Sequence, residues 1–380
     1  MVTMAMMRIV LSAGEASGDA YGAALIREIR KATDLPVNFR AIGGTQIRAE
    51  GTEIIADSSH WGAIGAIEAV KLARDVLVGR KRLEEELSSG TPGLFMPIDF
   101  GFVNVRMCRV AKARGWKVLY FIPPGSWRRD RQGADLPTIT DAIVTPFPWS
   151  AEMLNRNGGN AHFFGHPLKQ LIQGEMEKLP DSSRVPDSIA LLPGSRNHEL
   201  KFHLPILAKA LPLIEASRGR PVTAIFGLAP GASVAAIQTR WIQLSGRKSD
   251  HFEVGKSTQV LSTAEAALVC SGTATLQAAL CNTPHVIFYR ATRLLEVQRA
   301  ITRTPWPKFI GLPNIILDRG AVPEFVQMAA TPEAIANEFL RVQRDSSGQL
   351  AAFAELSELL GEPTAISRAA RLAVEIASRV

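Results

Sequence analysis

Short apolar runs alternate with longer amphipathic segments along the whole chain. Runs rich in valine, isoleucine and leucine are typical of strands buried inside a parallel sheet, and the amphipathic segments between them are typical of connecting helices. In the first half the predicted strands are residues 7–13, 37–42, 54–56, 94–98, 118–122 and 142–144. In the second half they are residues 189–192, 222–226, 252–254, 266–270 and 286–289.

The chain has 380 residues, which is more than one hydrophobic core usually serves, so two domains are expected. A polar stretch without a predicted strand, residues 173–186, is the expected linker. We therefore predict an α/β fold of two Rossmann-like domains, with a cleft between them and bridging C-terminal helices. The expected domains are residues 1–172 and residues 187–345, with helices at 346–380 that pack back on the first domain.

The segment at the middle of the chain, Ile189–Glu199 (IALLPGSRNHE), is typical of an anion-binding loop. Its apolar run ends at Gly194 and Ser195, and a predicted helix begins at once. Backbone N–H groups and the Arg196 guanidinium therefore gather at a helix N-terminus, where a phosphate binds well. Arginine suits phosphate because its planar fork donates two parallel hydrogen bonds. The alternative is a tight turn with a surface arginine.

A second turn of small residues follows the predicted strand at 266–270. It consists of Ser271, Gly272 and Thr273, and it opens another predicted helix. Two such turns in one domain suggest a diphosphate ligand, although neither is a P-loop or a dinucleotide fingerprint. The short loop that contains Asn314 is expected to return to the cleft, and a helix is expected to begin at Pro323.

Acidic residues follow two predicted strands in the first half. Glu15 and Asp19 lie in a glycine-rich turn, and because they would repel a phosphate, we expect them to accept hydrogen bonds from sugar hydroxyls. Asp99 lies at the carboxyl end of a strand, where open α/β sheets bind ligands, and a partly buried carboxylate there can act as a general base. The alternative for Asp99 is to cap a helix. His166 could line the cleft, but a lone histidine is more often structural.

The net charge of +7 favours anionic partners. A predicted helix that ends near Leu87 follows the apolar segment 61–70 and carries a cluster of basic residues. These are Lys71, Arg74, Arg80, Lys81 and Arg82. The combination predicts contact with an anionic membrane surface. The alternative is an ordinary amphipathic helix with a solvated basic face.

Several other classes are disfavoured. Hydrophobic residues make up 46% and charged residues 21%, which is the balance of a folded protein. No apolar run approaches the roughly 20 residues that cross a bilayer, and no cleavable signal pattern is visible, so we expect a cytoplasmic protein. Three cysteines are expected to be reduced core residues, without metal or cofactor. They are Cys108, Cys270 and Cys281.

One further cluster combines aromatic and basic side chains. It consists of Trp127, Arg128, Arg129 and Arg131. One such cluster without an RNA-binding motif is poor support for nucleic-acid binding, so no nucleic-acid partner is expected. The sequence leaves the oligomeric state open.

Ordered segments over nearly the whole chain resemble the lipid A disaccharide synthase family, whose members are glycosyltransferases of the B-type two-domain fold. The segments are AGEASGD (13–19), GG and AEG (43–51), GAIGAIEA (62–69), PID (97–99), FGHPL (164–168), LLPGSR (191–196), SGTATL (271–276), LPN (312–314) and PEFVQ (323–327). No single segment is decisive, but together and in this order they are specific.

The resemblance implies transfer of diacylglucosamine from its UDP-activated form onto diacylglucosamine 1-phosphate, which gives a β-1,6-linked disaccharide and UDP with inversion at the anomeric carbon. Asp99 matches the family's essential aspartate and would act as the base on the acceptor hydroxyl. Glu15 is the second predicted catalytic residue. Arg196 matches the family's UDP-binding arginine. The implied UDP-sugar site also contains Gly194, Ser195, Ser271, Gly272, Thr273, Gln277, Asn314, Glu324 and Gln327. The resemblance also implies that the protein acts at the surface of the inner membrane.

The chain departs from the family pattern mainly where the acceptor is expected. Phe100-Gly101-Phe102-Val103 follows Asp99 where the family supplies a proline and a second aspartate. Gln277 stands where such transferases usually carry a glutamate for the ribose hydroxyls, although an amide still accepts a hydrogen bond. The alternatives are therefore a paralogue with a changed acceptor or no activity, and a UDP-sugar epimerase of the same fold.

Overall fold

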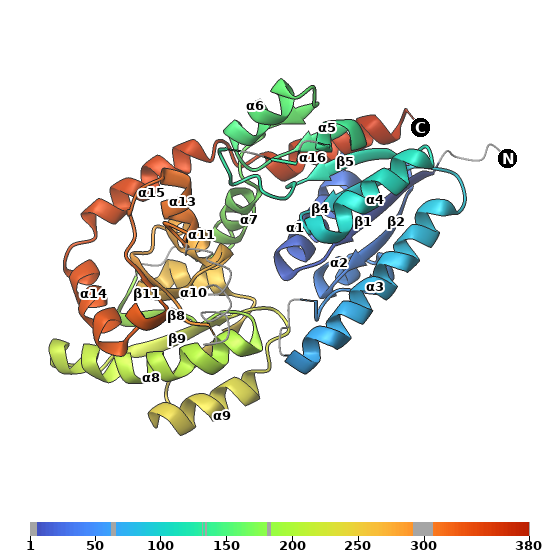
Figure 1. Ribbon diagram of the computed structural model, residues 1–380. Coiled ribbons are helices and arrows are strands. Elements are labelled where there is room, and N and C mark those ends of the chain that lie inside the picture. The colour runs from blue at the N-terminus through green and yellow to red at the C-terminus, as the bar shows by residue number, and fades with distance from the viewer. Residues whose placement is uncertain are drawn as a thin grey trace. The chain divides into compact units, whose positions relative to one another are not determined.

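The computed structural model describes residues 6–61, 66–130, 132–133, 135–180, 184–291 and 307–379, with side chains from residue 73 onward in the helix that begins at residue 66. The chain divides into two compact units (Figure 1). The first unit consists of Met1–Leu171 together with Leu360–Val380, and the second is Ile172–Leu359. Each unit is an α/β fold built on one parallel sheet, as the alternating pattern predicts.

A sheet of seven parallel strands forms the centre of the first unit, in the order β3-β2-β1-β4-β5-β6-β7. The strands are β1 (Met7–Ala13), β2 (Val37–Gly43), β3 (Glu53–Asp57), β4 (Leu94–Ile98), β5 (Lys117–Phe121), β6 (Ala142–Val144) and β7 (Ala161–His162). The helices are α1 (Ala16–Ala32), α2 (Thr45–Ala49), α3 (Ala66–Ser88), α4 (Gly101–Ala113), α5 (Leu136–Ile139), α6 (Pro148–Arg156), α7 (Pro167–Met176, across the unit boundary) and α16 (Ala365–Ala377).

The second unit has a sheet of six parallel strands, in the order β10-β9-β8-β11-β12-β13. The strands are β8 (Val185–Leu192), β9 (Thr223–Leu228), β10 (His251–Val254), β11 (Ala264–Cys270), β12 (His285–Tyr289) and β13 (Glu324–Val326). The helices are α8 (Asn197–Arg218), α9 (Val234–Ser245), α10 (Ser257–Thr263), α11 (Thr273–Leu280), α13 (Leu312–Leu317), the 3-10 helix η1 (Gln327–Ala329), α14 (Pro332–Arg344) and α15 (Ser347–Leu359).

Two local predictions differ from the structure. A strand, β13, occupies Glu324–Val326, where a helix was expected from Pro323, because this segment adds to the sheet edge with Ile287 opposite Glu324. The stretch 173–186 contains the end of α7 and the beginning of β8, so the strandless linker expected there is shorter.

The C-terminal helices divide between the units, although residues 346–380 were all expected on the first domain. Helix α15 contacts α11 and α13 of the second unit, whereas α16 contacts α1 and the strands β1, β4 and β5 of the first. Gly165 explains the close docking ahead of α16: its φ is +95°, and a Cβ there would lie 1.8 Å from the carbonyl oxygen of Glu362. The backbone N–H of His166 also donates to the carbonyl of Leu360 at 2.8 Å.

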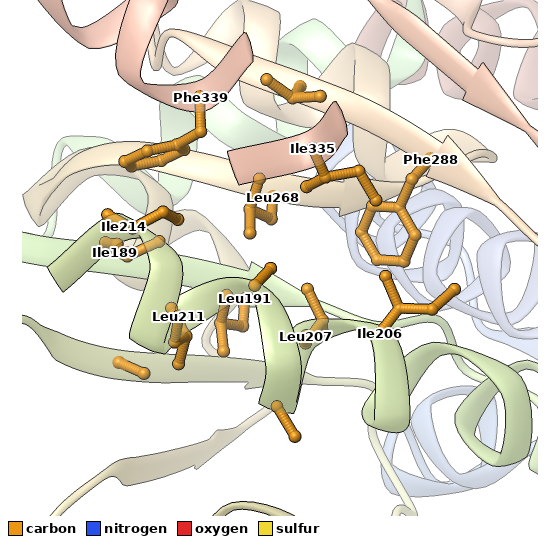
Figure 2. Close-up of a cluster of buried hydrophobic side chains, with 14 of the residues drawn as sticks. Ile189, Leu191, Ile206, Leu207, Leu211, Ile214, Leu268, Phe288, Ile335 and Phe339 are labelled. Carbon is orange, nitrogen blue, oxygen red and sulfur yellow. The ribbon is translucent and has the colours of Figure 1, made fainter. Parts of the chain in front are cut away.

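The core of the second unit lies between its sheet, α8 and α14 (Figure 2). Leu207 and Leu211 on α8 and Ile335 and Phe339 on α14 are fully buried with the sheet residue Leu268. Burial of each such side chain contributes about 1.5–3 kcal/mol, so this layer fixes the sheet that carries the loops of the candidate site.

Replacing Phe339 with alanine should lower the free energy of unfolding by about 3–5 kcal/mol, because the fully buried ring leaves a cavity. Denaturant unfolding followed by circular dichroism measures the change. Asn337→Ala, at an exposed position of the same helix, is the control and should change stability by less than about 0.5 kcal/mol. Equal effects of the two variants would contradict this account of the core.

Candidate functional site

The candidate residues follow the strands at which each sheet reverses its order. In the first unit the neighbours β1 and β4 end level, with Ala13 opposite Ile98, and their connections lead to opposite sides of the sheet. In the second unit the corresponding neighbours are β8 and β11, with Leu192 opposite Val269. Such a reversal leaves a crevice at the carboxyl ends of the two strands, which is where open α/β sheets bind ligands.

Asp99 follows β4 in an unusual backbone conformation. Its φ is 46° and that of Phe100 is 48°, so two consecutive non-glycine residues are left-handed, at a cost of roughly 1–2 kcal/mol each. Backbone bonds hold this turn: the N–H of Asp99 donates to the carbonyl of Phe121 at 3.0 Å. The Tyr120 hydroxyl donates to the carbonyl of Asp99 at 2.9 Å. Strain held in this way is characteristic of functional sites.

A buried amide completes the support of Asp99. Asn104 on α4 donates to the carbonyls of Asp99 (2.9 Å) and Ser12 (3.0 Å), and its Oδ1 accepts from the Ser12 hydroxyl at 2.7 Å. This side chain therefore joins the ends of β1 and β4. Sequence reasoning assigned no role to Ser12, Asn104 or Tyr120. The available signal was a serine inside an apolar strand and an asparagine on a buried helix face.

The Asp99 carboxyl has a pKa raised from its usual range to about 6. Burial is the main cause, the negative charge of Glu15 adds to it, and a hydrogen bond from the backbone N–H of Phe100 opposes it. Glu15 is exposed at the N-cap of α1. The two predicted acidic residues therefore interact, and a carboxylate with this pKa is suited to general-base chemistry near neutral pH.

Asp19 does not have the expected sugar-binding role. Its buried carboxylate accepts hydrogen bonds from the backbone N–H groups of Gly44 (2.7 Å), Gln46 (2.9 Å) and Ile47 (3.1 Å). These are donors at the N-terminus of α2, where an acidic side chain is favourable. Asp19 is therefore a helix cap that fixes α2 against α1.

The N-terminus of α8 differs from the open anion site expected there. Oε2 of the buried Glu199 accepts from the backbone N–H groups of Ser195 (2.9 Å) and Arg196 (3.1 Å). A Cβ on Gly194 would lie 2.4 Å from the same oxygen, so glycine is required at this position. The Arg196 guanidinium lies 3.4 Å from Oε1 of Glu199, and its side chain is 35% exposed. A ligand anion at this loop would therefore meet the guanidinium, because Glu199 already uses the N–H groups of Ser195 and Arg196.

The N-terminus of α11 is the more open of the two. Gly272 and Thr273 are exposed, Gly272 has a φ of 144°, and a Cβ there would meet nothing within 4 Å. The first N–H groups of a helix have no partner inside the helix, so they can bind an anion. The Ser271 hydroxyl donates to the carbonyl of Ile310 at 2.8 Å, so it fixes the loop.

Asn314 and Glu324 hydrogen-bond to each other and to nearby backbone groups. Asn314 is 1% exposed. Its Nδ2 donates to the carbonyl oxygen of Val322 and to Oε1 of Glu324, both at 2.7 Å. Its Oδ1 accepts from the backbone N–H groups of Ala321 and Val322, both at 2.8 Å. Glu324 also accepts from the N–H groups of Ile310 and Gly311, both at 2.8 Å. The donors and acceptor of the Asn314 amide are thus all used inside the protein, and its role in ligand binding stays a prediction.

Gln277 and Gln327 each use one end of the side-chain amide internally. Nε2 of Gln277 donates to the Thr258 hydroxyl at 2.9 Å, which leaves Oε1 as the acceptor for a ligand. Oε1 of Gln327 accepts from the N–H of Ala291 at 3.0 Å, and its buried Nε2 has no hydrogen-bond partner among the described residues. Gln327 therefore ties the end of β12 to β13.

The remaining histidine and cysteine candidates are structural. His166 is buried, burial lowers its pKa to about 3, and its ring packs on Phe147 with centroids 5.5 Å apart. All three cysteines are buried free thiols, and burial raises the pKa of each. Over the described ranges no cluster of three or more histidine, cysteine or acidic side chains is arranged to hold a metal.

Part of the predicted basic, apolar surface lies on α3. Leu77 and Val78 are 48% and 43% exposed, and Arg74, Lys81 and Arg82 are exposed on the same helix. Residues 62–65 and the side chain at position 71 lie outside the described residues. Wherever the structure is described, the helices are too short or too polar to cross a bilayer.

The predicted aromatic and basic loop follows β5. Trp127 is 49% exposed, with the Arg128 guanidinium 5.5 Å from its ring centre. The Arg129 guanidinium stacks 3.9 Å from the ring centre of Trp149. The remaining predicted member, at position 131, lies outside the described residues.

Solved structures share this architecture at low sequence identity. A UDP-GlcNAc 2-epimerase from Methanocaldococcus jannaschii aligns with a TM-score of 0.61 and 12% identity, covering 98% of this chain and 100% of that one. A glycotransferase of kitacinnamycin aligns with a TM-score of 0.62 and 13% identity, covering 98% of this chain and 99% of that one. At such identities these similarities establish the fold alone, which is that of the B-type glycosyltransferases and related epimerases.

Sequence relatives are more specific. The family profile described as "Lipid-A-disaccharide synthetase" matches residues 9–371. The lipid-A-disaccharide synthase of Syntrophus aciditrophicus is 30% identical over 383 residues, and the alignment covers 97% of each chain. The lipid-A-disaccharide synthase of Neisseria meningitidis serogroup B is 35% identical over 342 residues, and the alignment covers 86% of each chain. The chain therefore belongs to the lipid-A-disaccharide synthase family and is a glycosyltransferase of lipid A biosynthesis.

Proposed function

We propose that the chain transfers 2,3-diacylglucosamine from its UDP-activated form onto 2,3-diacylglucosamine 1-phosphate, with UDP as the second product. Membership of the family supports lipid A precursors as substrates. The observation that carries the proposed mechanism is the strained, half-buried Asp99 at the point where the first sheet reverses its order. Its raised pKa suits the removal of a proton from the acceptor hydroxyl.

The proposed reaction is a single displacement. Asp99 takes the proton of the acceptor's 6-hydroxyl while that oxygen attacks the anomeric carbon from the face opposite UDP. The new C–O bond forms as the bond to the diphosphate breaks, so the anomeric configuration inverts and the product is β-1,6-linked. Glu15 has a positioning role here, because its charge keeps the pKa of Asp99 close to neutral.

The second unit is the proposed nucleotide-binding part. The Arg196 guanidinium and the open N-terminus of α11 together supply positive charge for the diphosphate, and they stabilise the charge that develops as UDP leaves. Gln277 keeps an acceptor for a ribose hydroxyl. Asn314, Glu324 and Gln327 act indirectly, since they hold the loops around this surface.

Phe102 is a feature of the proposed acceptor-binding side that departs from the family pattern. It is 85% exposed in the first turn of α4, within the segment 100–103 where the family pattern has a proline and a second aspartate. An exposed aromatic ring in this position offers an apolar contact in place of a charge. We assign it to the acyl-bearing side of the acceptor.

We also propose that α3 contacts the cytoplasmic face of the inner membrane. Exposed apolar side chains beside exposed arginines match an interfacial helix, whose apolar residues enter the headgroup region while its cations pair with anionic lipids. Such a location suits an enzyme that acts on acylated substrates.

Asp99→Asn should lower turnover by about 10²–10⁴-fold, because the general base is lost, while UDP affinity is retained. Arg196→Gln should instead weaken UDP binding about tenfold or more, since one charge-assisted contact is removed. UDP release from UDP-diacylglucosamine and its 1-phosphate acceptor measures turnover, and calorimetry measures UDP binding.

Other outcomes separate the alternative functions. Full turnover by Asp99→Asn would show that Asp99 is not the general base. Wild-type binding of UDP without turnover would indicate a non-catalytic paralogue. Conversion of UDP-N-acetylglucosamine to its epimer in the absence of acceptor would indicate an epimerase.

The acid limb of kcat/KM should have its midpoint near pH 6, because the base must be ionised and its pKa is about 6. Activity should therefore fall about tenfold for each pH unit below that value. Glu15→Gln removes a negative charge that raises this pKa, so the midpoint should move to lower pH. An unmoved acid limb in Glu15→Gln would show that the two carboxylates are not coupled.

Arg74→Gln/Arg82→Gln should bind anionic phospholipid vesicles roughly thirtyfold more weakly than the wild type, because each of the two cations near such a surface contributes about 1 kcal/mol. Vesicle sedimentation measures the affinity, and added salt should reduce the difference. The charge-matched control is Arg240→Gln/Lys248→Gln, at exposed positions in the second unit. Equal loss in both double variants would contradict a specific surface on α3.

A further inference from the structure

Arg290 lies directly after β12, next to the strand whose end carries Ser271–Thr273. It is half-buried, and within the part of the chain that the structure describes its guanidinium has no hydrogen bond and no ion pair. Taking a charge out of water is unfavourable unless it is paired, so a partly buried guanidinium is stabilised by an anion. A cation placed at the carboxyl edge of a parallel sheet without a protein anion suits an anionic ligand.

Negative charge lies beside Arg196 at this edge of the sheet. Glu199 is buried beside Arg196 and uses the N–H groups of that loop, so it offsets most of the positive charge that the loop offers a diphosphate. Lys256 and Lys308 are near ion-pair partners, at 2.9 Å and 3.5 Å from Glu253 and Asp318. Among the described residues that follow the strands of the second unit, Arg290 is therefore the cation whose charge is not offset.

His203 on α8 fixes the backbone of Arg290. Its Nδ1 lies 2.6 Å from the carbonyl oxygen of Pro193, which only accepts, so Nδ1 carries the proton. Burial lowers the pKa of His203, and with the proton on Nδ1 the neutral ring accepts at Nε2 from the backbone N–H of Arg290 at 3.0 Å. Nε2 also lies 3.1 Å from the carbonyl oxygen of Arg290. The ring packs edge-on against Phe288, 5.1 Å between centroids. One imidazole thus joins the loop after β8 to the loop after β12, with β11 between them.

We infer that Arg290 is a second diphosphate-binding arginine of the nucleotide site, and that His203 is the positioning residue that holds its backbone against the Pro193 loop. The inference rests on the proposed function, since it assumes a UDP-sugar in the second unit. In this arrangement Arg290 supplies a cation that balances the charge of Glu199. The neutral ring of His203 then serves to hold the loop after β8 against the loop after β12.

The first test compares UDP with uridine as ligands of the full chain. Arg290→Gln should weaken UDP binding about tenfold to a hundredfold by calorimetry, because a charge-assisted contact to phosphate is lost. Uridine competition should be unchanged, since uridine has no phosphate. Arg290→Lys should recover part of the affinity, and Arg240→Gln, the same charge change on α9, should bind UDP as the wild type does.

The second test asks whether His203 acts through Arg290. His203→Leu should weaken UDP binding, and His203→Gln should recover part of it, because Oε1 can accept from the same N–H. The double variant His203→Leu/Arg290→Gln should be little worse than Arg290→Gln alone, since coupled residues are not additive. Circular dichroism and unfolding midpoints check that each variant is folded.

Each failure has a distinct meaning. No UDP binding by the wild type would overturn both the proposed function and this inference. Normal UDP binding by Arg290→Gln, with Arg196→Gln impaired, would overturn the inference alone. Equal loss of UDP and uridine binding would show that Arg290 supports the fold, and fully additive effects would show that His203 does not act through Arg290.

Discussion

The reversal of strand order inside each parallel sheet is the constraint on which both parts of the candidate site depend. At β1 and β4, and again at β8 and β11, the chain leaves neighbouring strands toward opposite sides. The connecting helices therefore diverge, and the loops between them keep polar groups that no helix covers. The layers of leucine, isoleucine and phenylalanine around the sheets matter for function because they keep these strand ends level.

Each unit holds a partly or fully buried carboxylate, but the surroundings of the two carboxylates differ. In the first unit a carboxylate is kept reactive by burial and by an acidic neighbour, on a backbone turn that Asn104 and Tyr120 hold in place. In the second unit a buried carboxylate closes one helix N-terminus, while another remains open. A carboxylate therefore serves as a reactive group in one unit and as an internal hydrogen-bond acceptor in the other.

Local patterns were enough to predict the parallel strands other than β7 and β13, and the positions of Asp99, Arg196 and Gly272, because strand ends and helix starts are local features. Partners could not be predicted, because they come from distant parts of the chain. Asn314 and Glu324 match family motifs, yet only the fold shows that they bond to each other. The strand at Glu324–Val326 likewise forms because β12 lies beside it, whereas its sequence alone resembles a helix start.

The contact between Gly14 and Phe100 has a consequence for evolution. A Cβ on Gly14 would lie 2.2–2.5 Å from atoms of the Phe100 ring, and that ring also packs on Trp61 with centroids 5.5 Å apart. A bulky residue at position 100 is thus compatible only with glycine at position 14. In descendants of this protein the two positions should vary as a pair, and a smaller residue at 100 must come first before any side chain can appear at 14.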